Sequence, residues 1–310
     1  MRIVFMGTPA AAVPTLERCL ADGHEIVAVW TQPDRPSGRG NKITASPVKE
    51  FALANNLAVD QPQKIKTEEA KALFASHDAD VAVVVAYGRI LPPEFLQAPR
   101  RGCVNVHFSL LPKYRGAAPV NWAIVKGESS TGVTTMVVEQ QLDAGPILLQ
   151  QETEIGSAET APELMARLAP MGADLLSETL DRLEELTPIT QHDDEATFAP
   201  ILKREDGLIN WSEDGTAIER AVRGFQPWPN AFTLYHDERL IVWRAEVIDS
   251  TPLTVVQPGE IITARGDDLS VRCGKQSVLR LLEVQLQGSR RMNARDFLNG
   301  THVTIGDKLG

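Results

Sequence analysis

Asn105 and His107, two positions apart, are the side chains in this sequence whose types and spacing best suit chemistry. The run Cys103–His107 alternates like the end of a β-strand, and residues two apart on a strand point to the same face. An amide there offers a hydrogen-bond donor, and an imidazole beside it can carry a proton. A lone histidine is more often a buried side chain satisfied by a carbonyl. The neighbouring amide and the turn Ser109–Pro112 that follows favour a functional pair instead.

The elements around this pair must place it at the carboxyl edge of a sheet. Short apolar runs alternate with helix-like runs over the first half of the chain. This alternation predicts an α/β fold with a doubly wound, Rossmann-like parallel sheet, which binds ligands beyond the carboxyl ends of its strands. The predicted parallel strands cover residues 2–7, 25–31, 57–60, 80–87 and 103–107. Residues 132–138 and 146–155, rich in Val, Thr and Ile, should extend the sheet as antiparallel strands.

Capping patterns predict where several of the intervening helices begin. Ser46 is followed by Pro47, and Thr160 is followed three residues later by Glu163. The helix from Thr160 should run to about Leu186. Other helices are predicted over residues 8–23, 67–77 and 118–126.

The turn after the first strand reads Gly7-Thr8-Pro9 and lacks the Gly-x-Gly-x-x-Gly pattern that cradles a dinucleotide pyrophosphate. The sequence therefore argues against a dehydrogenase, despite its Rossmann-like alternation.

The second half of the chain predicts a separate small β domain. Residues 188–207 are rich in Pro and acidic residues and indicate a linker after a first domain of residues 1–187. A short helix over 216–225 then precedes short strands, which cover residues 231–235, 239–247, 260–263, 269–272 and 278–286. This spacing is typical of a small closed barrel over residues 208–310, although the pattern alone allows other small β folds.

Charge and composition limit the possible partners. The net charge is −10, with −9 on residues 1–199 and −1 on residues 200–310. Because neither half is basic, any nucleic-acid binding must depend on local patches. Three distant cysteines fit neither a zinc site nor a disulfide framework and suit a reducing cytosol. The six histidines are scattered, so we expect no metal site, and no run is long enough for a membrane span.

The motif Asn105-x-His107-x-Ser-Leu-Leu-Pro112, followed by Tyr114-Arg-Gly116, resembles the folate-dependent formyltransferases. Leu142-Asp-Ala-Gly145 resembles the second motif of that family. Gly7-Thr8-Pro9, the stretch 32–40 and Trp228-Pro229 are most similar to the branch that formylates methionyl-tRNA. The resemblance covers nearly the whole chain, with its motifs in order.

Two residues depart from the family pattern. Phe108 stands where a small residue is more usual, and Ala144 stands where Thr is common. The sequence leaves open whether the bulky Phe108 faces the folate pocket or points away from it.

The resemblance implies a co-substrate, a partner and residue roles. The formyl donor would be 10-formyltetrahydrofolate, bound by the domain of residues 1–187, and the acceptor would be initiator methionyl-tRNA. Asn105 would stabilise the oxyanion, His107 would move the proton, and Asp143 would orient His107 and favour its charged form. The folate-contacting turn would comprise Ser109, Leu110, Leu111 and Pro112. The enzyme would be a cytoplasmic monomer with no metal and no membrane partner.

Two regions are expected to contact tRNA. The polar loop over residues 32–47 contains a single acid, Asp34, and the resemblance implies that Arg39 and Lys42 guide the end of the tRNA. The family also implies an OB-like, tRNA-binding fold for residues 208–310, where Arg290, Arg291 and Arg295 cluster near the end.

Three alternatives stay open at the level of sequence. Glycinamide ribonucleotide formyltransferases share the Asn, His and Asp constellation but generally lack a domain like residues 208–310. Some formyltransferases that act on amino-sugar nucleotides carry a similar second domain. A folate-binding or RNA-binding module without catalysis would not need Asn105, His107 and Asp143 together.

Overall fold

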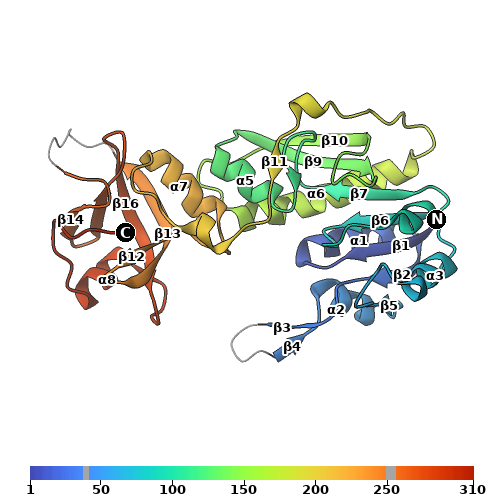
Figure 1. Cartoon of the computed structure of the whole chain (residues 1–310), viewed down its shortest axis with the longest axis horizontal. Helices are drawn as coiled ribbons and strands as arrows, with labels where there is room; N and C mark the ends of the chain where they lie inside the picture. Colours follow the sequence, from blue (N-terminus) through green and yellow to red (C-terminus); the bar gives the residue numbers. More distant parts are fainter. Residues whose placement is uncertain (38–41, 249–255) are drawn as a thin grey trace. The chain divides into compact units, whose positions relative to one another are not determined.

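The computed structural model describes residues 1–37, 42–248 and 256–310, and the side chains of Ser37 and Lys42 lie outside this description. The chain forms two compact units (Figure 1). Unit 1 comprises Met1–Pro119, Ser130–Glu154 and Met165–Pro200. Unit 2 comprises Val120–Ser129, Ile155–Leu164 and Ile201–Gly310.

A seven-stranded sheet organises unit 1, in the order β10-β9-β7-β6-β1-β2-β5. Its strands are β1 (Arg2–Gly7), β2 (Glu25–Trp30), β5 (Val59–Asp60), β6 (Val81–Val85), β7 (Cys103–His107), β9 (Ser130–Val137) and β10 (Ile147–Glu154). The five neighbouring strands β7, β6, β1, β2 and β5 are parallel to one another. Strand β9 runs antiparallel to β7, and β10 runs antiparallel to β9. This topology confirms the predicted sheet, including its antiparallel extension.

Helices cover both faces of this sheet, as the apolar pattern of its strands requires. All five residues of β6 are buried, which is typical of a strand covered on both sides. On one face, Trp30 of β2 packs edge-on against Phe74 of α3 (Glu68–Ser76) and Phe95 of α4 (Pro93–Gln97). On the other face lie α1 (Val13–Ala21) and α6 (Ala161–Asp181), which are joined by a hydrogen bond from Ser177 to Asp22.

The helix starts predicted from capping residues agree with the structure, but the predicted end of one helix does not. The Ser46 hydroxyl accepts a hydrogen bond from the backbone N–H of Lys49 at the start of α2 (Pro47–Ala54). The prediction that α6 runs to about Leu186 was wrong, because the helix ends at Asp181. Turn hydrogen bonds replace the helix over residues 182–186, ahead of Pro188, which disfavours helical backbone before it.

The stretch predicted as a long polar loop contains a small hairpin. Strand β3 (Arg35–Ser37) pairs antiparallel with β4 (Lys42–Thr44). Each strand has only three residues, so it carries too few side chains to reveal a period of two in the sequence.

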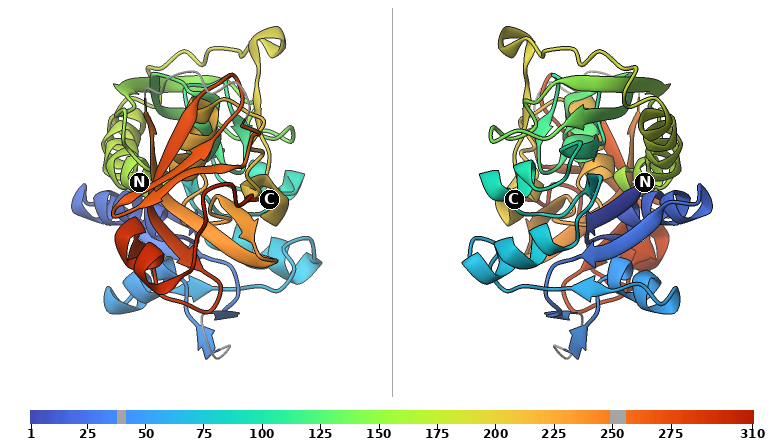
Figure 2. Two further views of the ribbon diagram at one scale, coloured as in Figure 1. Left: turned by 90° about the vertical axis from the view of Figure 1, so that its left-hand side faces the viewer. Right: turned by 90° about the vertical axis from the view of Figure 1, so that its right-hand side faces the viewer.

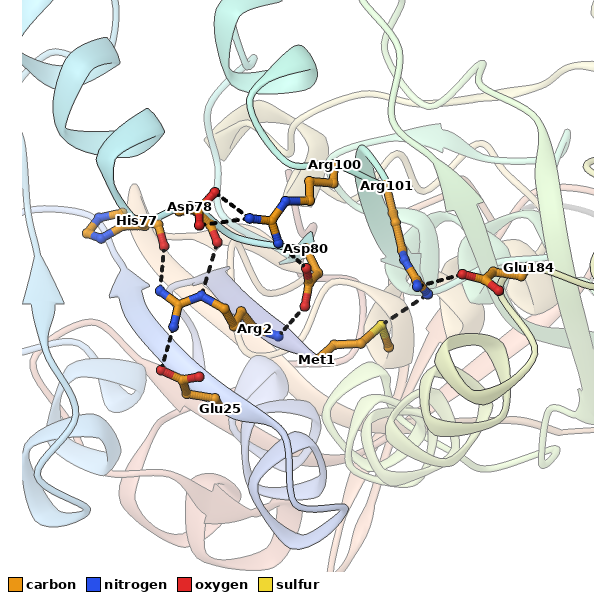
Figure 3. A network of polar contacts seen from close by, with 9 residues as sticks. All are labelled: Met1, Arg2, Glu25, His77, Asp78, Asp80, Arg100, Arg101 and Glu184. Atoms are coloured by element: carbon orange, nitrogen blue, oxygen red, sulfur yellow. Dashed lines mark hydrogen bonds and ion pairs between the residues drawn. The ribbon is translucent and has the colours of Figure 1, made fainter.

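Charged groups gather at the amino end of the parallel strands (Figure 3). The Arg2 guanidinium donates to Glu25 and to the carbonyls of His77 and Asp78. The backbone N–H of Arg2 and the side chain of Arg100 hold the pKa of Asp80 below its usual value. These pairs are largely exposed and contribute little stability each. They occupy the edge opposite to the carboxyl ends, where ligands bind in such sheets.

Unit 2 is built on an antiparallel sheet in the order β12-β13-β16-β15-β14. Its elements are β12 (Phe232–Tyr235), β13 (Glu238–Ile248), β14 (Ile261–Arg265), β15 (Asp268–Arg272), β16 (Val278–Leu286), β17 (Met292–Asn293), α7 (Gly215–Gly224) and α8 (Ala294–Gly300). Its strands, orange and red in the left-hand view of Figure 2, cross one another steeply.

The last residues of the chain join the two edge strands of this sheet. Backbone hydrogen bonds link Ile261 to Asp307 and Leu309 to Gly259, beside β14. The N–H of Gly310 donates to the carbonyl of Leu234 in β12. The sheet therefore closes on itself, in agreement with the predicted small barrel.

Two segments that precede residue 165 in the sequence also belong to unit 2. In α5 (Pro119–Lys126), the Asn121 amide donates to the carbonyl of Gly224 at 2.7 Å, and Trp122 packs edge-on against Phe225. Arg223 donates to the carbonyl of Glu159 at 2.9 Å. Unit 2 is thus assembled from three separate stretches of chain. Within the described ranges, no helix is long and apolar enough to cross a membrane.

Candidate active site

Asn105 and His107 lie at the end of β7, between β6 and β9. Asn105 is opposite Val84 of β6 and Met136 of β9, and His107 is opposite Thr134. They share the strand face of Cys103, which belongs to the core beneath α3 and α4. Burial raises the pKa of the Cys103 thiol to about 12. Cys103 is therefore a protonated, buried side chain at neutral pH and not a nucleophile.

His107 is buried, and both of its ring nitrogens face oxygen atoms. Nε2 lies 3.0 Å from the carbonyl oxygen of Tyr114, which can only accept, so Nε2 carries a proton. Nδ1 lies 3.7 Å from Oδ2 of Asp143. That separation is an ion-pair distance but is longer than a hydrogen bond. The ring is therefore fixed on one side by a backbone carbonyl and lies beside a carboxylate on the other.

Asp143 is held in place through its backbone as well as its side chain. Its Oδ2 accepts a hydrogen bond of 2.9 Å from the N–H of Gly116. Its backbone has a φ of 50°, in the left-handed region that aspartate tolerates better than most residues. The Gln191 amide donates to the carbonyls of Asp143 at 2.9 Å and Gly145 at 2.7 Å. A buried side chain therefore fixes the loop that presents the carboxylate.

Gln191 is itself held by Arg115, which is 2% exposed. Nε of Arg115 donates to Oε1 of Gln191 at 2.9 Å, and a second guanidinium nitrogen pairs with Asp193. The hydroxyl of Thr197 accepts from the N–H of Tyr114 at 2.9 Å. One hydrogen-bond network thus joins residues 191–197, which follow α6, to the two segments around His107, residues 114–115 and residues 143–145.

A two-stranded pairing completes this network. Strand β11 (Phe198–Ala199) pairs in parallel with β8 (Arg115–Gly116). A Cβ on Gly116, whose φ is 126°, would lie 2.4 Å from the carbonyl oxygen of Ala199, so only glycine fits. Gln191, Thr197 and β11 all fall within the stretch 188–207 that the sequence indicated as a linker. Sequence reasoning missed these residues because isolated polar side chains in an irregular segment carry no periodic signal.

The Asn105 side chain is partly exposed and makes no hydrogen bond within the parts of the chain that the structure describes. This distinguishes it from His107 and Asp143, which both have partners. An amide left open at the carboxyl edge of a strand can donate to a ligand oxygen without breaking an existing bond.

The turn of Ser109, Leu110, Leu111 and Pro112 is stabilised by internal contacts. The Ser109 hydroxyl donates to the carbonyl of Lys113 at 2.6 Å. Thr134 bonds to both the carbonyl of Ser109 and the N–H of Leu111. Gln150 donates to the carbonyl of Leu111, whose buried side chain packs with Met136 and Ile147. These contacts make the turn rigid, as a preformed binding surface would be.

Phe108 points away from the His107 face. A Cβ on Gly172 of α6 would lie 3.4 Å from the Phe108 ring and 2.8 Å from Val106. Val106 and Phe108 therefore pack together beneath α6, on the opposite side of the strand from Asn105 and His107. The bulky side chain fills core space and does not crowd the candidate site.

At the base of the β3–β4 hairpin, the negative charge of Asp34 is neutralised by a neighbouring lysine. Asp34 accepts a hydrogen bond from Gln61 and pairs with Lys49 at 2.6 Å, and both contacts lower the pKa of Asp34. Arg39 lies outside the described residues, as does the side chain of Lys42, whose backbone belongs to β4. Their predicted contact with tRNA stays a prediction.

Comparisons with known proteins give a consistent result. The family model of formyl transferase matches residues 1–180, and that of the formyl transferase C-terminal domain matches residues 201–302. A methionyl-tRNA formyltransferase of Solibacter usitatus is 49% identical over 315 residues, covering 100% of this chain and 99% of that protein.

Two solved structures resemble the fold at 16% sequence identity. WlaRD, a sugar 3N-formyl transferase determined in the presence of dTDP and 5-N-formyl-THF, has a TM-score of 0.67, covering 94% of this chain and 99% of that one. HypX from Aquifex aeolicus, in complex with tetrahydrofolic acid, has a TM-score of 0.65. The match covers 96% of this chain but only 47% of HypX, so the chain spans about half the length of that protein.

Proposed function

Because the chain belongs to the formyl transferase family, and within it to the methionyl-tRNA formyltransferases, we propose that it formylates initiator methionyl-tRNA. The donor is 10-formyltetrahydrofolate, and the acceptor is the α-amino group of the esterified methionine. The observation that supports this proposal best is the open amide of Asn105 beside the buried pair of His107 and Asp143.

The reaction is an acyl transfer to an amine, without a covalent enzyme intermediate. The amine nitrogen forms a bond to the formyl carbon, the bond between that carbon and folate N10 breaks, and one proton passes from the amine to N10. Negative charge develops on the formyl oxygen as its carbon becomes tetrahedral. The protein must therefore stabilise an oxyanion and carry one proton.

Asn105 donates its amide N–H to the developing oxyanion. Its lack of a partner within the described ranges supports this role, because no existing hydrogen bond must be broken. A donor oriented before the reaction stabilises the transition state without reorganisation.

His107 takes the proton from the amine and delivers it to the leaving nitrogen. Because Nε2–H is engaged by the Tyr114 carbonyl, proton transfer falls to Nδ1. Asp143, at 3.7 Å from Nδ1, stabilises the imidazolium that forms between the two transfers.

The remaining assignments follow from the same proposal. The rigid turn of Ser109–Pro112 contacts folate, within a catalytic domain of residues 1–187. Arg39 and Lys42 contact the tRNA end, and residues 208–310 bind tRNA without taking part in the chemistry. The enzyme acts in the cytoplasm as a monomer.

The alternative acceptors are glycinamide ribonucleotide and amino-sugar nucleotides. The likeness to a sugar formyltransferase at 16% identity concerns the fold alone. The relative at 49% identity over the full length favours the tRNA substrate.

A direct comparison of acceptors tests the proposed function. Formyl transfer from 10-formyltetrahydrofolate is measured with methionyl initiator tRNA, glycinamide ribonucleotide and an amino-sugar nucleotide in parallel. We expect kcat/KM for the tRNA to exceed the other two by about 10³-fold or more, because unpaired polar groups in a site reject wrong substrates strongly. Comparable or greater turnover of either small acceptor would contradict the proposal.

Replacing Asp143 by asparagine should lower the rate of formyl transfer. The asparagine oxygen can still accept from Gly116, so the loop keeps its shape. Loss of the negative charge makes the imidazolium that forms during the reaction less stable, so proton transfer should slow. We expect kcat to fall by roughly 10- to 100-fold, with folate-analogue affinity unchanged. Full activity would exclude the pairing.

Gln191 provides a matched test of positioning. Gln191→Met removes the donors to the Asp143 and Gly145 carbonyls at nearly constant volume. It should lower kcat less than Asp143→Asn does and leave folate-analogue affinity unchanged. Gln151→Met, at an exposed position on β10, is the control and should leave both quantities unchanged.

A further inference from the structure

A short stretch of backbone contacts both His107 and Asp143. The carbonyl oxygen of Tyr114 lies 3.0 Å from Nε2 of His107. Two residues later, the N–H of Gly116 donates to Oδ2 of Asp143 at 2.9 Å. This backbone therefore sets where the imidazole and the carboxylate lie relative to each other. The residue between its two contacts is Arg115.

The backbone at Tyr114 needs support to keep its conformation. Its φ is 62°, in the left-handed region that a bulky aromatic residue rarely occupies. Such a conformation persists only where the surrounding structure holds it. The hydroxyl of Thr197 accepts from the N–H of Tyr114, and the carbonyl of Thr197 accepts from the N–H of Arg115, both at 2.9 Å. One side of this backbone is thus held by the segment that follows α6.

The side chain of Arg115 extends the same support to the loop that carries Asp143. Its Nε donates to Oε1 of Gln191 at 2.9 Å, and the Gln191 amide donates to the carbonyl of Asp143 at 2.9 Å. A second guanidinium nitrogen pairs with Asp193 at 2.8 Å. The backbone of Arg115 therefore belongs to the stretch that contacts both groups of the pair, and its side chain belongs to the hydrogen bonds that fix one of them.

Stability alone does not account for this arginine. Its side chain is 2% exposed, whereas its carboxylate partner on Asp193 is 75% exposed and stays solvated. The third nitrogen of the guanidinium group, Nη2, is buried and has no hydrogen-bond partner among the described residues. A buried cation with a solvated partner and an unpaired donor costs free energy, and an apolar side chain of similar size is often as stable. The guanidinium supplies geometry instead, because its planar group holds two partners in fixed directions.

We propose that Arg115 is a positioning residue for formyl transfer. It fixes the separation of His107 and Asp143 by tying the backbone of residues 114–116 to Gln191. Because Arg115 is buried, it acts through these groups and not by contact with the substrate. The inference rests on the roles that the proposed function gives to His107 and Asp143. The competing explanation is that the arginine only stabilises the fold and leaves the geometry of the pair unaffected.

Removing the guanidinium tests this role by kinetics. Arg115→Met keeps an extended side chain without any donor, and Arg115→Lys keeps the charge but cannot hold two partners in one plane. For Arg115→Met, kcat should fall by about 10-fold with KM unchanged, because a small displacement of catalytic groups slows the chemistry without weakening binding. The kcat of Arg115→Lys should lie between those of Arg115→Met and the wild type.

A double-mutant cycle with Gln191→Met shows whether the two side chains act together. If Arg115 positions Asp143 through Gln191, the double variant should be no more than about 2-fold slower than the slower single variant. Losses in kcat that multiply would mean that the two side chains act independently, and they would overturn the proposal.

A spectroscopic measurement reports the geometry of the pair and does not depend on the acceptor. The ring N–H at Nε2 of His107 is buried and faces a carbonyl, so it should give a distinct NMR signal in protein made with isotope-labelled histidine. His107→Ala assigns this signal by removing it. Arg115→Met should shift the signal, whereas a role confined to stability predicts that the signal stays in place.

Asp193 offers a test that leaves the interior of the protein undisturbed. Its side chain is exposed, so Asp193→Ala should fold normally. The variant should lower kcat by about 3-fold, as expected for loss of one solvated ion pair, and should shift the His107 signal. Asp194→Ala is the matched control, because the neighbouring carboxylate is exposed and has no ion pair among the described residues. The control should change neither quantity.

The outcomes separate this proposal from the proposed function. If a correctly folded Arg115→Met protein keeps the wild-type kcat and the wild-type His107 signal, Arg115 is not a positioning residue and the proposal is overturned. If Arg115→Met does not fold, Asp193→Ala compared with Asp194→Ala decides by the same two measurements. If the wild-type protein formylates only small acceptors, the proposed function fails, and the same variants still test Arg115 with that acceptor and by the His107 signal.

Discussion

His107→Ala should lower kcat for formyl transfer by about 100-fold or more, with folate-analogue binding preserved. The imidazole is the only group among the site residues described above that can both accept and return a proton near neutral pH. Its removal leaves the attacking amine without a base and the leaving nitrogen without an acid. Single-turnover formylation of methionyl-tRNA, measured by rapid quench, reports this step without interference from product release.

A second histidine supplies the control for that experiment. His77 is partly buried and its ring lies 3.0 Å from the carboxylate of Asp60, and it is not one of the residues of the candidate site. His77→Ala removes the same kind of side chain from the same kind of pair and should affect stability but not the single-turnover rate. A correctly folded His107→Ala protein with a near-normal rate would show that the assigned role is wrong.

Asn105→Ala should lower kcat by about 100- to 1000-fold, the range for loss of one oxyanion donor. The effect should fall on kcat and leave folate-analogue affinity nearly unchanged, because the donor strengthens its contact only as charge develops on the formyl oxygen. The amide is partly exposed and has no partner among the described residues, so its removal leaves no other buried group unsatisfied. The variant should therefore unfold at close to the wild-type temperature.

Asn105→Asp sharpens this test at constant size. A carboxylate at this position accepts hydrogen bonds and repels a developing negative charge, so the variant should be at least as slow as Asn105→Ala. A raised KM with an unchanged kcat in either variant would make Asn105 a binding residue and contradict the oxyanion role.

The sequence predicted most of the fold, because the fold follows from local and periodic signals. The apolar run that became β6, the cap at Ser46 and the alternation around Asn105 all depend on residues close together in the chain. The family inferred from the ordered motifs was likewise confirmed by the comparisons. These features depend on the regular spacing of buried residues and on helix-capping residues, and both can be read directly from the sequence.

The support around Asp143 could not be predicted in the same way. Gln191 reaches the Asp143 loop from 48 positions later in the sequence, and Thr197 reaches Tyr114 from 83 positions later. Strand β11 has only two residues, too few for any periodic pattern. Such contacts depend on which irregular segments meet in space, and their polar residues could equally have faced solvent.

Because unit 2 is assembled from three stretches of chain, it limits which segments can be exchanged between members of this family. The family models divide the sequence after residue 180 and begin again at residue 201, as if the second part were a separate module. Yet Asn121 caps the end of α7, and Glu159 accepts from Arg223 within unit 2. A Cβ on Gly224 would lie 2.6 Å from the side chain of Val125, so the two surfaces fit only as a matched set. A chimera that takes residues 201–310 from another family member must therefore also take residues 120–129 and 155–164, or its transplanted helix will meet the wrong surface.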